Sequence, residues 1–114
     1  MVAEFDDRVI GFMVYELHKD HLHVLNFAVH PDLQCQGVGR QMAEKLIGKL
    51  SHERRNRISL EIRETNLDAQ LFFRNLGFVA TDVLRDHYED TTEDAYLMVF
   101  RHGWEDISLL DKFN

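Results

Sequence analysis

The stretch from Val29 to Arg40 reads VHPDLQCQGVGR, and it joins an extended segment to a helical one through a turn with two glycines. Before it, Leu22–Val29 is rich in β-branched, aromatic and aliphatic residues, which predicts a strand ended by Pro31. After it, apolar residues recur at spacings of three and four, which predicts a helix from Val38 to about Ser51. The apolar stripe of that helix comprises Val38, Met42, Ala43, Leu46, Ile47 and Leu50.

The glycine turn has the composition of an anion site. Glycines at 37 and 39 allow a close approach of the backbone to a ligand, and the unpaired amides of the first helical turn would face a phosphate. Arg40 adds a cation at the rim. A tight corner that uses glycine for packing is the alternative, and the turn alone leaves both interpretations open. A P-loop is excluded because no Gly-Lys-Ser/Thr triplet exists, and Met42 is too bulky for the dinucleotide fingerprint.

The rest of the chain predicts further strands and a second helix around this unit. Residues 57–63 alternate between aliphatic and polar, so Glu61 is expected to point away from the face of Ile58, Leu60 and Ile62. Asn66 or Asp68 can cap the second helix, which Gly77 closes. The remaining expected strands are a short one through Phe5, Arg8–Leu17 after a turn at Asp6 and Asp7, Phe78–Leu84, and Ala95–Arg101 after the acidic connection Glu89–Asp94.

Length and composition limit the kind of protein. The 114 residues suit one domain, which we assign to residues 1–101, with 102–114 as a C-terminal tail. A net charge of −7 makes a general attraction to nucleic acid or anionic membranes unfavourable, and no apolar run is long enough for a membrane span. The single cysteine, Cys35, excludes an internal disulfide and indicates a reducing compartment. We therefore expect a cytoplasmic protein.

Two motifs resemble the GNAT acetyltransferases. Gln34, Gly37 and Gly39 match the pattern Q/R-x-x-G-x-G/A of that family's pyrophosphate loop, and a second helix that opens with Asn66 and ends in Gly-Phe follows at the right separation. The ribosomal-protein alanine N-acetyltransferases are the most similar subgroup. The resemblance implies an α/β (α+β) fold with a mixed, mostly antiparallel sheet and flanking helices, without the strand and helices that precede the hairpin in the family. Either the chain is a fragment or a second copy covers the sheet, so a homodimer is expected.

The resemblance also implies acetyl-coenzyme A as co-substrate. It would lie between two parallel strands that splay apart, here Leu22–Val29 and Ile58–Ile62. Main-chain amides of 36–40 would hold the pyrophosphate, and the Val29 amide is a candidate donor to the thioester oxygen. The implied cofactor contacts are Val29, Gln34, Gln36, Gly37, Val38, Gly39, Arg40, Asn66 and Phe73.

The implied catalytic groups are incomplete. Glu61 occupies the position of the family's general base, with a surface carboxylate paired with Arg63 as the alternative. Phe73 stands where the family has a tyrosine acid, and a phenyl ring cannot donate a proton. Tyr88 or Tyr15 could replace it, or could serve in packing. A thiolate leaving group with a pKa of about 8.5 makes transfer without an acid slow but feasible.

The leading hypothesis is an N-acetyltransferase acting on a primary amine, with a protein N-terminus favoured over lysine because its pKa is about 8 rather than about 10.4. The alternative is a coenzyme A binding module that is weakly active or inactive. A metal protein is a third hypothesis, because four histidines cluster between His18 and His30. Cys35 could act as an acyl acceptor or be a bystander thiol.

Overall fold

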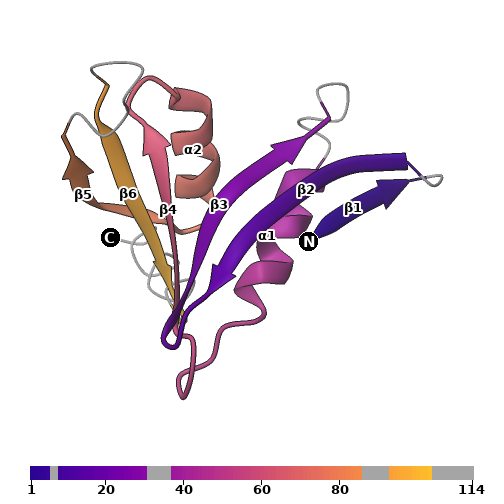
Figure 1. Cartoon of the computed structure of the whole chain (residues 1–114), viewed down its shortest axis with the longest axis horizontal. Coiled ribbons are helices and arrows are strands. Elements are labelled where there is room, and N and C mark those ends of the chain that lie inside the picture. The colour runs from indigo at the N-terminus through magenta and orange to yellow at the C-terminus, as the bar shows by residue number, and fades with distance from the viewer. Residues whose placement is uncertain (6–7, 31–36, 86–92, 104–114) are drawn as a thin grey trace, which may run out of the picture.

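The computed structural model describes residues 1–5, 8–30, 37–85 and 93–103. Helices and strands alternate there in the expected order ββ, βαβ, αββ (Figure 1). The elements are β1 (Val2–Phe5), β2 (Arg8–Leu17), β3 (His21–Val29), α1 (Val38–Ile47), β4 (Arg57–Arg63), α2 (Leu67–Asn75), β5 (Val79–Leu84) and β6 (Ala95–Arg101).

One six-stranded sheet carries the fold, in the order β1-β2-β3-β4-β6-β5. Neighbouring strands are antiparallel except β3 and β4, which are parallel. The prediction of a mixed, mostly antiparallel sheet is therefore confirmed. The parallel pair arises because α1 returns the chain to the start of the sheet before β4 begins, as a βαβ unit requires.

Both helices contribute to one core on one face of the sheet. Ile58, Leu60 and Ile62 alternate along β4 and are at most 4% exposed. Met42 and Leu46 of α1 belong with them and with α2 residues to a single apolar cluster. Because successive strand residues point to opposite faces, the other face of β4 carries the intervening polar residues. We call these the helix face and the open face.

The first helix ends earlier than its apolar stripe predicts. It stops at Ile47 rather than near Ser51, with Gly48 as its C-cap. The amides of Lys49 and Leu50 then bond to carbonyls three residues back, at 3.0 Å, which is the tighter 3₁₀ spacing. Leu50 is 6% exposed and belongs to the core. The apolar period therefore predicted the burial of Leu50 correctly, but the predicted length of the helix was wrong.

The other boundaries follow the sequence closely. Asn66 is the N-cap of α2, where its side chain accepts the Ala69 amide at 3.2 Å, and Gly77 follows the helix with φ 105°. β3 starts one residue before the prediction, at His21. The turn at residues 6–7 lies outside the described residues. Within the described parts of the chain, no helix is long and apolar enough to cross a membrane.

Apolar side chains on several strands remain exposed. Val2, Phe12 and Val14 are 57%, 37% and 47% exposed. Val2 pairs with Phe12 across β1 and β2, so these two lie on the same face. Phe12 and Val14 alternate with Met13, which is 2% exposed and lies on the helix face. The exposed side chains therefore lie on the open face. The edges of the sheet are β1 and β5.

Candidate active site

The parallel strands separate halfway along their length. Pairing between β3 and β4 runs from His21 and Arg57 to Val24 and Leu60. From there to Val29, β3 is paired with β2 and no longer with β4. Figure 1 shows the two strands diverging in a V, with α2 beside the opening. The expectation that these two strands splay apart is confirmed.

A β-bulge accounts for the separation. The β2–β3 register pairs Val14 with Asn26 and Tyr15 with Val24, which leaves Leu25 as the extra residue. Leu25 comes directly after the last residue of β3 that pairs with β4. A bulge bends its strand and increases its twist, so β3 follows β2 away from β4 at this point.

The separated edge of β3 presents backbone groups toward the V. The His30 amide donates to the Ile10 carbonyl at 2.7 Å, which makes these two residues a hydrogen-bonded antiparallel pair. Such pairs alternate along the strands, so the neighbouring pair of Gly11 and Val29 is not hydrogen-bonded. The peptide groups of Val29 therefore point to the edge of β3 that faces β4.

The N-terminus of α1 has the backbone geometry of an anion site. Gly37 is the N-cap with φ 84°, in the left-handed region, and no side chain caps the helix. The first intrahelical bond is from the Gln41 amide to the Gly37 carbonyl, at 3.0 Å. The amides of residues 38–40 thus precede the hydrogen-bonded ladder, and the first turn holds no acidic side chain.

Gly39 has a packing role. A Cβ atom at Gly39 would lie 3.3 Å from Cζ of Phe72 and 3.4 Å from the ring of Phe27. These contacts are tighter than ordinary side-chain packing, so glycine lets α1 lie close against α2 and β3. At Gly37, in contrast, a Cβ would meet nothing within 4 Å. Packing explains Gly39 and backbone conformation explains Gly37.

Other predicted cofactor residues lie around this turn. Arg40 is exposed and donates from Nε to Glu44 at 2.9 Å. The ring of Phe73 is 6% exposed and packs against Phe27 and Phe72, with centroids 5.7 Å and 5.0 Å away. Asn66 caps α2 through its side-chain oxygen. Gln34, Gln36, Cys35 and Tyr88 lie outside the described residues.

Glu61 lies on the open face, as expected from the alternation of β4. It is exposed, whereas its neighbours Leu60 and Ile62 are 4% exposed. It follows directly after Leu60, the last residue of β4 paired with β3. Because α1 packs on the helix face, α1 and the carboxylate of Glu61 lie on opposite sides of the sheet. Tyr15, paired with Val24, packs against the core from the helix face.

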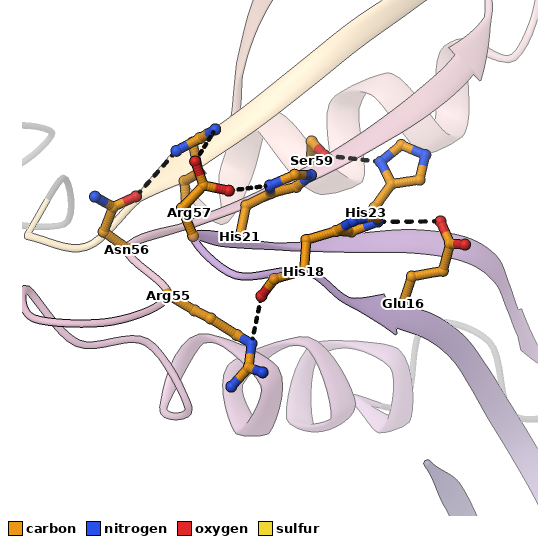
Figure 2. Close-up of polar contacts among 9 residues, drawn as sticks. Glu16, His18, His21, His23, Arg55, Asn56, Arg57 and Ser59 are labelled. Atoms are coloured by element: carbon orange, nitrogen blue, oxygen red, sulfur yellow. Dashed lines mark hydrogen bonds and ion pairs between the residues drawn. The ribbon is translucent and has the colours of Figure 1, made fainter.

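A polar cluster on the open face was not foreseen. His23 Nδ1 and Ser59 Oγ lie 2.7 Å apart across β3 and β4 (Figure 2). At the start of β3, His21 bonds to Asp20 at 2.7 Å, and Arg57 bonds to the same carboxylate at 3.2 Å. The hydrogen bond from His21, helped by that from Arg57 and by its charge, lowers the pKa of the Asp20 carboxyl. Within the described residues, no group of three potential ligands could hold a metal ion.

Two cavities flank the site instead of filling it. One of about 700 Å³ lies between α2 and the strands β5 and β6. The other, of about 210 Å³, lies between β1 and α1 and is lined in part by Val38. Neither is lined by Val29 or Glu61, so the geometry of the separated strands defines the site.

A family model described as the acetyltransferase (GNAT) family matches residues 1–78. The chain belongs to the GNAT family. The match confirms the resemblance drawn from the two motifs. The match spans the glycine turn, Glu61 and α2, so all the described candidate residues lie within it.

Named relatives belong to the same family. A [ribosomal protein bS18]-alanine N-acetyltransferase of Salmonella typhimurium is 34% identical over 95 residues, which cover 82% of this chain and 64% of the relative. The crystal structure of the ribosomal-protein-S18-alanine N-acetyltransferase of Escherichia coli superimposes with a TM-score of 0.77 at 31% identity, covering 86% of this chain and 64% of that one. The structure of Chaetomium thermophilum Naa20 with a bisubstrate analogue has a TM-score of 0.81 at 26% identity, covering 88% and 64%. This GNAT chain thus spans just under two thirds of the length of these relatives.

Proposed function

We propose that this GNAT chain transfers the acetyl group of acetyl-coenzyme A to a primary amine, foremost an N-terminal amine of a protein. The observation that carries the proposal is the end of β3–β4 pairing at Val24 and Leu60, together with an uncapped start of α1 whose Gly39 packs against Phe27 on the separated part of β3. This arrangement offers a site for a phosphate and an edge for an extended ligand arm in one place.

The cofactor fits the backbone groups of the site. The amides of residues 38–40, together with Gln34, Gln36 and Gly37, receive the pyrophosphate, and Arg40 adds positive charge at the rim. The arm runs along the separated edge of β3, where the Val29 peptide faces the V. The Val29 amide then donates to the thioester oxygen as negative charge develops.

The acceptor approaches from the open face. Glu61 contacts the incoming ammonium there, and the amine that results attacks the thioester carbon through the gap between the strands. The cofactor's phosphates and the acceptor thus reach the reacting atoms from opposite sides of the sheet. Asn66 and Phe73 at α2 complete the cofactor side, and Tyr88 supplies a proton to the leaving sulfur.

An N-terminal amine is the favoured acceptor. The similar relatives named above carry N-acetylation of an alanine in their names. An α-amino group has a pKa of about 8 and lysine one of about 10.4, so a site with a phenylalanine at position 73 finds far more neutral α-amine at pH 7.

Thiol release from acetyl-coenzyme A tests the proposal directly. A peptide that begins with a free alanine should release coenzyme A and gain one acetyl group by mass spectrometry. The matched control is the same peptide with a formylated N-terminus and an internal lysine, which should react far more slowly. Absence of amine-dependent release with every peptide would overturn the enzymatic proposal.

Phe73 favours a second candidate, a coenzyme A binding module with little or no turnover. Its ring is 6% exposed in the aromatic cluster of the core and carries no proton to donate. Calorimetric binding of acetyl-coenzyme A without any acetylated peptide would identify this function.

Assembly and location complete the proposal. A homodimer would cover the exposed Val2, Phe12 and Val14 of the open face, and light scattering on a sizing column would show twice the mass of the monomer. A location in the cytoplasm, without nucleic-acid partners, agrees with one cysteine and a net charge of −7. Cell fractionation checks the location.

A further inference from the structure

We infer that His23 accepts, at Nε2, the proton that the acceptor ammonium loses on the open face. This inference rests on the proposed acetyl transfer and adds to it a proton acceptor beyond Glu61. The sequence offers His23 only as one of the four clustered histidines of the metal hypothesis and gives it no catalytic role. Its position, its fixed ring and its chemistry carry the argument.

The register puts His23 next to the reaction path. His23 pairs with Ser59 one rung before the strands part, and Glu61 lies two residues after Ser59 on the same face. Two strand residues advance about 6.6 Å and neighbouring strands lie about 4.8 Å apart, so the Cα atoms of His23 and Glu61 are on a diagonal of about 8 Å. The side chains of His23 and Glu61 can bridge this distance by direct contact or through one water molecule.

A hydrogen bond holds the imidazole in place. Nδ1 of His23 lies 2.7 Å from Oγ of Ser59, which is 8% exposed and is the buried polar residue of the described chain. When Nδ1 carries the proton it donates to Oγ, and Nε2 keeps its lone pair. In Figure 2 the ring of His23 lies beyond Ser59, on the side away from His21. The bond thus holds the ring in place, and in the tautomer with the proton on Nδ1 it leaves Nε2 able to accept a proton.

His23 differs from the other two histidines of the cluster. His18 and His21 stack on each other at 4.4 Å and bond to the carboxylates of Glu16 and Asp20, at 3.3 Å and 2.7 Å. The partner of His23 is a neutral hydroxyl. Its charged neighbours across the sheet are Glu16, paired with it from β2, and Glu61 from β4, while its nearest titratable neighbour on β3 is His21.

The proton transfer balances with the acetyl transfer. The ammonium of the acceptor gives one proton to the carboxylate of Glu61, which passes it to Nε2 of His23, and the ring becomes an imidazolium. The neutral amine forms a C–N bond with the acetyl carbon, the C–S bond breaks, and the sulfur leaves with its electron pair as a thiolate. After the attack the nitrogen loses a second proton, which passes to the thiolate, while the imidazolium proton passes to solvent and the third proton stays on the new amide. An imidazole is a stronger base than an ordinary carboxylate by about two pKa units, which makes it the better acceptor of this proton.

The test compares variants in the full chain with acetyl-coenzyme A and an alanine-starting peptide. His23→Asn keeps a donor near the place of Nδ1 for Ser59 but removes the titrating nitrogen. We expect kcat to fall about a hundredfold, with the melting temperature and the acetyl-coenzyme A dissociation constant unchanged. Imidazole in the buffer should restore part of the rate of His23→Ala. His21→Asn, on the same strand and face, is the matched control and should keep the wild-type rate.

Two outcomes would overturn the inference while leaving the proposed function intact. One is a wild-type rate and pH profile of kcat in His23→Asn, and the other is a slow His23→Ala that imidazole does not rescue. A wild-type chain that acetylates no amine would instead refute the proposed function, and the role of His23 with it.

Discussion

Phe73 and Glu61 are the two residues on which the proposed acetyl transfer depends most. Phe73 is a core residue whose ring contacts three other phenylalanines, Phe27, Phe72 and Phe78. Glu61 is an exposed residue at the point where the strands part. Phe73 therefore serves the packing of the core, whereas Glu61 lies outside the core.

Replacing Glu61 should separate catalysis from folding. We expect Glu61→Gln to lower kcat about a hundredfold, because the amide cannot take a proton from the acceptor, while the melting temperature stays within a degree or so. Steady-state thiol release and thermal unfolding measure the two effects. Glu4→Gln, an exposed strand carboxylate on β1, is the control. Equal rates in both variants would assign Glu61 to the surface.

Phe73→Tyr restores a hydroxyl at this position of α2. We expect kcat to rise about tenfold, since the thiolate then leaves as a thiol, and the free energy of unfolding to fall by about 1 kcal/mol, since the hydroxyl enters an aromatic core. Thiol release and urea unfolding of the two proteins check this. A less stable variant with an unchanged kcat would show that the hydroxyl does not reach the sulfur.

At the scale of elements, the turn before α1 and the bulge in β3 prepare the site. Gly37 aims the first amides of the helix by adopting φ 84°, and Leu25 separates β3 from β4 by adding one residue to the strand. In the proposed function, neither feature requires a special side chain at the phosphate itself. The site is formed chiefly by backbone, which leaves the side chains of α1 to pack against the core.

Gly37 and Gly103 offer a matched pair for the role of this turn. Both have positive φ, 84° and 91°, and a Cβ at either would meet nothing within 4 Å. Alanine at either position should lower the free energy of unfolding by about 1 kcal/mol through backbone strain alone. Calorimetry should show weaker acetyl-coenzyme A binding for Gly37→Ala and unchanged binding for Gly103→Ala. Equal affinities would refute the phosphate role of the turn.

The whole molecule divides its work between the two faces of one sheet. The helix face holds the core with α1 and α2, and the open face holds Glu61, His23 and the polar contacts of Figure 2. The network around Asp20 joins the β2–β3 turn to β4 at the end where the strands stay paired. It stabilises the end of the β3–β4 pair at which the two strands remain hydrogen-bonded.

The hydrogen bonds of Asp20 make the free energy of unfolding depend on pH. The pKa of Asp20 lies below its ordinary value of 3.8, first because of the hydrogen bond from His21 and then because of Arg57. A lowered carboxyl pKa stabilises the fold above the unfolded value, and this contribution is lost as the pH falls through the folded one. We expect the difference in unfolding free energy between the wild type and Asp20→Asn to shrink as the pH falls below about 4 and through the lowered pKa of the folded state. Urea titrations from pH 7 to pH 2.5 measure it, with Glu53→Gln, expected to show no such trend, as the control.

Local patterns settle most of the elements. The alternation of residues 57–63 gives β4 and the outward side of Glu61, and Asn66 with Gly77 brackets α2, because side-chain period and capping are decided by near neighbours in the chain. The length of α1 was overestimated, since a buried Leu50 has the same period whether its turn is α or 3₁₀. The assignment of 1–101 as the domain and the roles of Val29, Asn66 and Phe73 toward the cofactor stay predictions.

The amino-acid sequence by itself determined the order of strands and helices, the glycine turn before α1 and the family. Tertiary structure alone decided where β3 separates from β4 and which residue of β4 His23 contacts. It also decided that position 39 has no room for a side chain beside Phe72 and Phe27. His23 and Ser59 are 36 residues apart in the chain, and no periodicity of one segment states which residue of another it will face. Register across the sheet is fixed by the packing of the whole core and by one bulge, so these contacts exist only once the sheet has formed.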